Sequence, residues 1–140
     1  MLGLINRVLD KPDAGKLLLR LAFGILLIFH GWHKVVDGVG AIAGMLTNAG
    51  LPTFIAYGVF AGEVVAPILL ILGILTRPSA LVVAGTMVVA QFLAAPAGFV
   101  SLAKTGAWGA EPTAVFFFAA LAIALLGSGK YSVMSNPNLR

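Results

Sequence analysis

Four long apolar stretches constrain the fold of this 140-residue chain more than any other feature. They are 17–36, 53–75, 79–96 and 111–127, and each contains at most two charged side chains. A helix needs about 20 apolar residues to cross the hydrocarbon core of a bilayer. Charged residues make up only 10% of the chain, whereas a soluble domain has about 25%. The sequence therefore predicts an all-α fold, a single domain over 1–140 with four transmembrane helices and the lipid bilayer as its surroundings.

The absence of cysteine excludes several kinds of chemistry from this chain. Disulfide exchange, thiolate metal sites and iron–sulfur clusters all require cysteine sulfur. The sequence also lacks a Gly-rich phosphate loop and the HExxH and GxSxG motifs. The net charge is +4, but the basic residues are scattered around apolar segments, so nucleic acid is not an expected partner.

The distribution of lysine and arginine predicts the orientation in the membrane. If both ends lie on one side, that side carries seven basic residues and the opposite side carries only Lys34 and Lys104. Cytoplasmic segments are enriched in basic residues. We therefore expect a multi-pass protein of the bacterial cytoplasmic (inner) membrane, with both termini and a tight turn at Thr76-Arg77-Pro78 in the cytoplasm.

Three segments outside the spans also carry a pattern. Residues 1–16 place Leu2, Ile5 and Leu9 on one helical face, which is typical of a short helix lying in the headgroup layer. The connections 37–51 and 97–110 are glycine-rich yet apolar. They resemble lids folded over a bundle, and a docking surface for a partner would look the same.

Depth arithmetic predicts that three polar side chains share one layer of the bundle. At a rise of ~1.5 Å per residue, His30 lies roughly 20 Å above the inner end of the first span. Glu63 lies about 15 Å below the outer end of the second span, and Gln91 roughly 18 Å up the third. We therefore expect a polar cluster of His30, Glu63 and Gln91 in the outer half of the bundle.

Glu63 is the strongest candidate for a functional residue. A carboxylate at this depth costs several kcal/mol unless it is paired, hydrated or protonated. Pro67, four residues on, cannot donate to the carbonyl of Glu63 and should kink the helix there. The Gly58-x-x-x-Gly62 spacing permits close approach of another helix. A purely structural pairing with His30 or Lys34 is the alternative.

The remaining candidates are ligand contacts or structural groups. His30 is a candidate proton relay beside Glu63, and Lys34, Gln91, His33 and Arg77 are candidate substrate-binding residues. Three of them have a structural alternative. Lys34 could pair with Asp37 or extend to the lipid headgroups, Gln91 could form an interhelical hydrogen bond, and Arg77 could be a topology signal and headgroup partner. His30, His33 and Glu63 could hold a metal in principle, but both histidines lie on one helix, so no metal site is expected.

Several short motifs resemble the DoxX family of membrane proteins over residues 17–132. His30-Gly31-Trp32-His33-Lys34 resembles the H-G-x-x-K-like end of that family's first span, and the end of the chain resembles its closing G-x-G-[RK]-Y-S. The other similar segments are Leu19-Arg20-Leu21, Gly50-Leu51-Pro52, Glu63, Leu72-Gly73-Ile74-Leu75-Thr76-Arg77, Ala84-Gly85-Thr86-Met87 and Gly127-Ser128-Gly129-Lys130-Tyr131-Ser132.

The resemblance implies a four-helix membrane bundle that works with oxidoreductase partners. One branch of the family resembles the membrane subunit of a thiosulfate:quinone oxidoreductase. The resemblance implies that the functional positions of the family correspond to His30, Lys34, Glu63 and Arg77. The leading hypothesis is a redox-associated membrane subunit, an oxidoreductase component that binds a quinone or a similar apolar ligand and has no evident cofactor of its own. The alternatives are a non-catalytic scaffold or assembly factor and, less favoured, a small transporter or proton conductor, for which a homo-oligomer would be needed.

Overall fold

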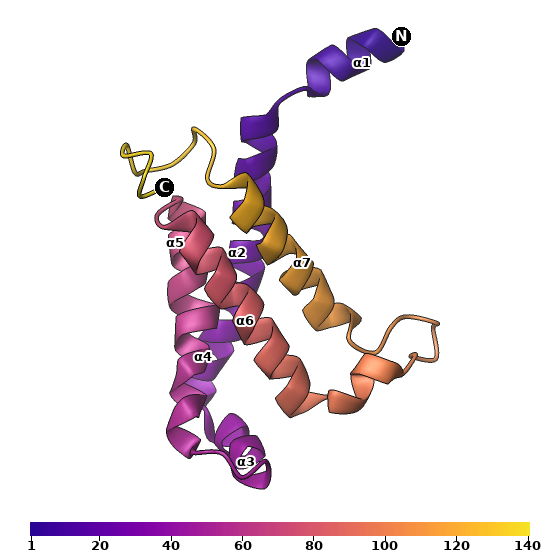
Figure 1. The fold of residues 1–140 in the computed structure, drawn as a ribbon, viewed down its shortest axis with the longest axis vertical. Coiled ribbons are helices and arrows are strands. Elements are labelled where there is room, and N and C mark those ends of the chain that lie inside the picture. The colour runs from indigo at the N-terminus through magenta and orange to yellow at the C-terminus, as the bar shows by residue number, and fades with distance from the viewer.

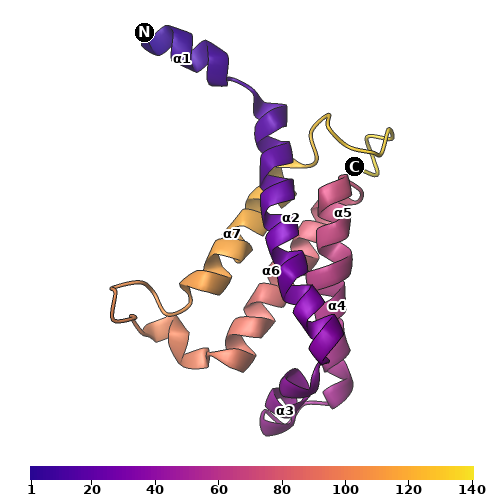
Figure 2. The ribbon, with the colours of Figure 1, turned by 180° about the vertical axis from the view of Figure 1, so that it is seen from behind.

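The chain is entirely helical apart from turns, loops and one isolated bridge between Leu102 and Trp108. A computed structural model describes all of residues 1–140, and Figures 1 and 2 show it from opposite sides. The elements in order are α1 (Leu2–Leu9), α2 (Pro12–Asp37), α3 (Gly40–Asn48), the 3-10 helix η1 (Thr53–Tyr57), α4 (Gly58–Phe60), the π helix η2 (Ala61–Val65), α5 (Ala66–Leu72), α6 (Thr76–Ala94), the 3-10 helix η3 (Pro96–Val100) and α7 (Glu111–Leu126).

Three of these helical segments are long and apolar enough to cross a membrane. They are α2 with 26 residues, the continuous run from η1 to α5 with 20, and α6 with 19. The fourth apolar helix, α7, is shorter, with 16 residues. The prediction of an all-α, multi-pass membrane protein is confirmed, with helix ends that differ by a few residues from those expected.

The connection between α5 and α6 differs from the sequence prediction. Thr76, Arg77 and Pro78 belong to the first turn of α6, and the turn itself is formed by residues 73–75. Gly73 has φ 77° and Leu75 has φ 45°, both in the left-handed region. Proline fits in the first turn of a helix because the amide it lacks has no partner there. Pro78 therefore marks a helix start rather than a turn.

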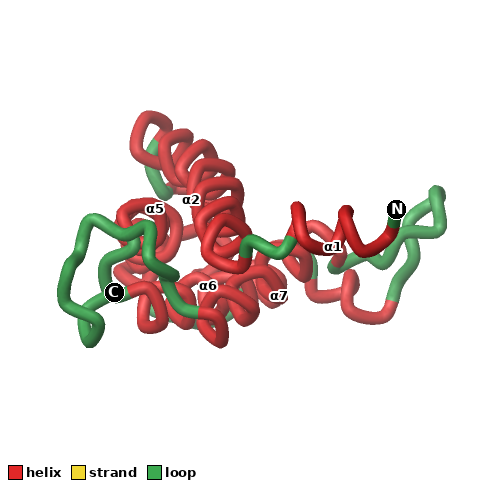
Figure 3. Tube along the Cα trace, turned by 90° about the horizontal axis from the view of Figure 1, so that it is seen from above, coloured by secondary structure: helices red, strands yellow, loops and turns green.

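A single apolar core joins the spans. Its fully buried members come from α2, α5, α6 and α7, and include Leu27, Leu70, Val83 and Ile123. Glycine lets α2 approach α5 closely, because a Cβ at Gly24 would lie 2.7 Å from the Ile71 side chain. Viewed from above, α2, α5, α6 and α7 gather into one bundle (Figure 3). Many large apolar side chains on its outside are exposed, among them Phe29, Phe118 and Leu125, as expected for helices surrounded by lipid.

Both ends of the chain lie at the same end of the bundle (Figure 1). The helix predicted in the leader is present as α1, which projects from the bundle and buries none of its residues. The C-terminal tail lies beside the turn between α5 and α6. The amide of Val133 donates to the Leu72 carbonyl at 3.0 Å, and the amide of Leu75 donates to the Leu139 carbonyl at 2.7 Å. The tail therefore covers the turn, while α1 has no partner in the protein.

Candidate functional site

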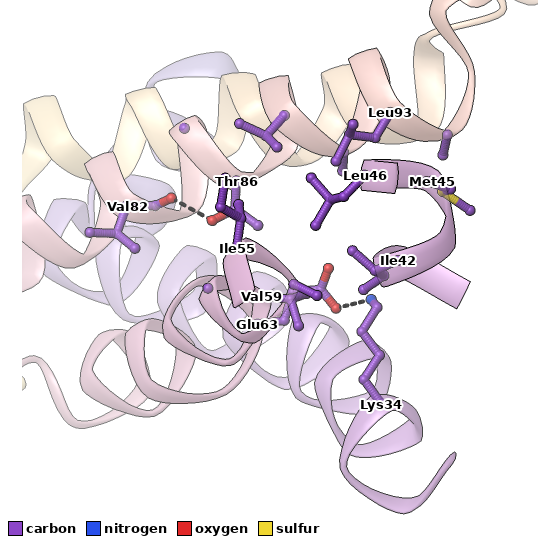
Figure 4. A pocket seen from close by; sticks show the side chains of 16 residues that line it. Lys34, Ile42, Met45, Leu46, Ile55, Val59, Glu63, Val82, Thr86 and Leu93 are labelled. Carbon is purple, nitrogen blue, oxygen red and sulfur yellow. Dashed lines mark hydrogen bonds and ion pairs between the residues drawn. The ribbon is translucent and has the colours of Figure 1, made fainter. Parts of the chain in front are cut away.

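The candidate site is a cavity between the second span, α6 and α3. Its volume is about 480 Å³, and apolar side chains form most of its wall (Figure 4). Ligand-binding cavities in proteins commonly measure ~300–1,000 Å³. The lining residues are Lys34, Ile42, Met45, Leu46, Ile55, Ala56, Gly58, Val59, Glu63, Val82, Gly85, Thr86, Val89, Ala90, Leu93 and Ala94.

Lys34 and Glu63 provide the only charged groups of this cavity. The Lys34 ammonium donates a hydrogen bond to Oε2 of Glu63, which joins the end of α2 to the second span. The Glu63 side chain is 7% exposed and that of Lys34 is 24% exposed. A buried carboxylate needs such a partner, because an unpaired charge away from water is costly. The pair thus places a donor and an acceptor at the wall of an otherwise apolar cavity.

A stripe of residues along α2 explains how the pair comes together. Arg20, Gly24, Leu27 and Gly31 are buried on one face of the helix, and Lys34 continues it at the spacing of three to four residues. Gly31 rests directly on the Glu63 carbonyl, and a Cβ there would overlap it. Because Lys34 follows Gly31 by three residues, its side chain extends past this contact to the Glu63 carboxylate.

The backbone around Glu63 is a π turn rather than a simple kink. The amide of Ala66 donates to the carbonyl of Ala61, five residues back, within the π helix Ala61–Val65. Pro67 lacks the amide that would bond the Glu63 carbonyl in an α-helix, so the widened turn replaces the expected kink. Such turns are frequent at functional sites.

The two glycines of the expected G-x-x-x-G contact have separate roles. Gly62 lies directly against the Thr86 side chain of α6, as the prediction of close approach requires. A Cβ at Gly58 would instead meet nothing within 4 Å, and Gly58 lines the cavity. Glu63, which follows Gly62, therefore lies at about the same depth in the bundle as Thr86 of α6.

The connection 37–51 forms a short helix over the cavity, in agreement with the predicted lid. Leu46 of α3 is 1% exposed, and it lines the cavity together with Ile42 and Met45. Figure 4 shows Leu46 and Ile42 pointing from α3 into the cavity, with Met45 at its edge. The apolar character of residues 37–51 is evident from the sequence, but the place of these three side chains at the site is not.

His30 and Gln91 lie elsewhere, so the predicted cluster with Glu63 is wrong as a geometry. The His30 ring is exposed and packs edge-to-face on Phe116 of α7, with 5.8 Å between ring centroids. It is one residue, or about 100° of helix, away from the stripe that carries Gly31. The Gln91 amide donates to the Ala95 carbonyl and accepts from Thr113 of α7. Counting residues along a span predicts the depth of a side chain but not its direction around the helix axis.

His33 and Arg77 also lie outside the cavity. His33 pairs with Asp37 one turn later on α2, with 2.5 Å between Nδ1 and Oδ2, and both side chains are largely exposed. Asp37 therefore pairs with His33 and not with Lys34. Arg77 is the second residue of α6, about 13 Å along the helix from the level of Thr86 at 1.5 Å per residue. Within the protein no three His, Asp or Glu side chains come together as ligands for a metal ion.

Arg20 is a buried residue with a structural role that the sequence did not reveal, although it belongs to the family-like segment Leu19-Arg20-Leu21. Its side chain is fully buried and donates to the carbonyls of Leu70 at 2.9 Å and Ile71 at 3.2 Å, and also to that of Tyr131. The last carbonyls of a helix have no partner within it. Arg20 therefore caps the end of α5 and holds the C-terminal tail. The sequence feature that indicates its burial is the spacing of Arg20 from Gly24 and Gly31, which places all three on one face of α2.

The fold and the cavity define a small multi-pass membrane protein of the helical-bundle class, with an ion pair at the wall of an apolar cavity. The chain belongs to the DoxX family, whose sequence profile, described as DoxX, matches residues 15–96. That range contains Lys34, Glu63 and all of α6, while α7 follows it.

One curated relative is a protein of Bacillus subtilis (strain 168) named "Putative oxidoreductase CatD". It is 37% identical over 65 residues, which cover 46% of this chain and 48% of the relative. The aligned part thus spans about half the length of that relative. No solved structure matches this chain.

Proposed function

We propose that this protein is a redox-associated membrane subunit that binds a quinone, or a similar apolar molecule with a polar head, in the cavity beside Lys34 and Glu63. The observation that carries the proposal is a cavity of about 480 Å³ whose charged groups are these two side chains. The name of the Bacillus subtilis relative supports an oxidoreductase role in class only.

The chemistry of the two side chains suits the two redox forms of a quinone head. A quinone carbonyl accepts a hydrogen bond from the Lys34 ammonium, and a hydroquinone hydroxyl donates one to the Glu63 carboxylate. Reduction takes up two electrons and two protons per quinone. A partner oxidoreductase supplies the electrons, and Glu63 and Lys34 hold or pass protons at the quinone oxygens. In this proposal His30 and Gln91 have no direct contact with the ligand.

The walls of the cavity suit the apolar part of such a ligand. Along α6 the lining runs from Val82 to Ala94, which is about 18 Å at 1.5 Å per residue. Val82 and Val89 are 44% and 50% exposed, so the α6 side of the cavity is open toward the surroundings of the helix. An isoprenoid chain fits an elongated apolar groove that opens to lipid.

The test is binding of a quinone with a short isoprenoid tail to the full chain in lipid nanodiscs. Ala90→Phe fills the cavity without touching the ion pair, and we expect its affinity to fall about tenfold or more. Leu81→Phe is the matched control, because Leu81 lies on the exposed side of α6 and does not line the cavity. This control should bind the quinone as the natural chain does.

The ion pair is tested by the double variant Lys34→Met/Glu63→Leu, which removes both charges together. Replacing a buried ion pair by apolar groups is often neutral for stability, so we expect a folded protein that has lost quinone binding. If the natural chain binds no quinone while Glu63→Gln lowers its stability, the pair serves helix packing and the protein is a scaffold.

A further inference from the structure

A basic region, separate from the cavity, lies at the start of α6, which is the end of that helix opposite α3. Residues 127–130 follow α7 as a short loop in which Gly127 and Gly129 have φ 73° and 71°. The amides of Ser128 and Gly129 have no acceptor within the protein. Two polar groups here therefore require a partner from outside the chain, such as water or a ligand.

Arg77 lies flat against this loop. A Cβ at Gly127 would lie 3.1 Å from Nη2 of Arg77 and 3.2 Å from both Cζ and Nη1. Because these three atoms are almost equally distant, the face of the guanidinium covers the Gly127 Cα. Arg77 is exposed and makes no hydrogen bond or ion pair with the protein. Packing thus fixes the group while its N–H donors, which form a fork suited to phosphate, stay free.

Two lysines add positive charge beside the guanidinium. The stem of Lys16 packs on Gly129, where a Cβ would lie 3.1 Å from its Cδ. The backbone amide of Lys130 donates to Asp13 at 3.1 Å, and the Lys130 ammonium lies 5.1 Å from the centre of the Tyr131 ring. Arg77 at Gly127, and Lys16 and the Asp13 carboxylate at Gly129, therefore lie along the same short loop that carries Lys130.

The loop is anchored beyond this point as well. Arg20 holds the Tyr131 carbonyl, and the Ser132 hydroxyl donates to the Gly73 carbonyl at 2.8 Å. A side chain at Gly73 would meet both Arg20 and Ser132. Because the tail is fixed at these contacts, the donors beside it are positioned before any ligand arrives, which lowers the cost of ordering them.

We infer that Arg77, Lys16, Lys130 and the 127–130 loop form a binding site for a phosphate ester at the membrane surface. The phosphate of an anionic phospholipid is the source that fits the location, because α6 begins and α7 ends here. Charge-assisted hydrogen bonds to phosphate oxygens are strong. This site is separate from the cavity, so it stands or falls independently of quinone binding.

The experiment is native mass spectrometry of the full chain released from mixed micelles of phosphatidylglycerol and phosphatidylcholine. We expect the natural chain to retain phosphatidylglycerol preferentially, and Arg77→Gln or Lys16→Gln to retain about fivefold less. Arg77→Lys keeps the charge but loses the forked N–H donors of the guanidinium. Its retention of phosphatidylglycerol should therefore lie between that of the natural chain and that of Arg77→Gln. Lys104→Gln, which removes one exposed positive charge at the other end of the bundle, is the matched control and should stay within about twofold of the natural chain.

The remaining outcomes separate the source of the phosphate from the existence of the site. Displacement of the lipid by millimolar inorganic phosphate, lost in Arg77→Gln, supports the phosphate site with a soluble source. Equal retention of phosphatidylglycerol by Arg77→Gln, Lys16→Gln and Lys104→Gln overturns the inference. Circular dichroism of each variant verifies that its helices are intact.

Discussion

Lys34 and Glu63 differ in how deeply they are buried, and the difference predicts unequal effects of single substitutions. Glu63 is 7% exposed, so Lys34→Met leaves an unpaired carboxylate inside the bundle. We expect this variant to lose about 3 kcal/mol of unfolding free energy. Glu63→Gln leaves instead an ammonium that is 24% exposed on a flexible stem, and should cost about 1 kcal/mol. Unfolding by sodium dodecyl sulfate in mixed micelles measures both, and equal losses would contradict the argument.

Arg20 is the residue whose loss should affect stability most without touching the cavity. Arg20→Met keeps an unbranched apolar stem but leaves the carbonyls of Leu70, Ile71 and Tyr131 without their donor. Hydrogen bonds to a charged group contribute about 1.5–3 kcal/mol each, and the cost of burying the guanidinium offsets part of their sum. We therefore expect a net loss of about 3 kcal/mol and faster proteolysis of the released tail. Arg7→Met in α1, where every residue is exposed, is the control, and equal proteolysis of the two would contradict this role.

At the residue scale, the leading prediction placed Glu63 with His30 and Gln91, which is wrong, whereas the alternative of a pair with Lys34 is the one that the structure contains. The identity of a polar residue and its depth along a span follow from counting residues. The direction of a side chain around its helix depends on which face is packed, and the buried stripe of Arg20, Gly24, Leu27 and Gly31 shows that face. His30 lies beside the stripe and so meets Phe116.

The second span is the element whose irregular backbone sets the direction of Glu63. Pro67→Ala restores an amide that can bond the Glu63 carbonyl, so the π turn can relax to an α-helix. That change rotates the residues before the π turn by about 100° around the helix axis relative to the residues after it. We expect quinone binding to fall while the helix content stays unchanged.

Binding measurements paired with circular dichroism check this expectation. Pro96→Ala at the start of η3 is the matched control, because this proline is outside the second span. Unchanged binding by Pro67→Ala would show that the proline does not set the position of Glu63.

At the same scale, the spans could be predicted because hydropathy and length decide them, and α1 because its apolar residues repeat at helical spacing. The π turn and the start of α6 at Thr76 could not, since each depends on where a missing proline amide is accommodated. The apolar pattern of residues 37–51 predicted a lid, but not its helical form or which helices it covers, because these depend on packing of α3 against α6.

The molecule as a whole has its two termini at one end, and the positive-inside rule predicts that this end is cytoplasmic. A green fluorescent protein fused after Arg140 should therefore fluoresce in a bacterial host. Alkaline phosphatase inserted after Lys104 should be active, because that connection is expected to face the periplasm. The opposite pair of signals would reverse the topology and place the 127–130 loop outside the cytoplasm.

The half-exposed valines of α6, Val82 and Val89, bear on how any occupant of the cavity reaches it. A molecule that arrives through this side dissolves first in the acyl chains, where apolar solutes are enriched over water. Its occupancy then follows its mole fraction in the membrane rather than its aqueous concentration. Affinities measured at different lipid-to-protein ratios should coincide only when they are expressed per lipid, and compounds of equal head chemistry should rank by their partitioning.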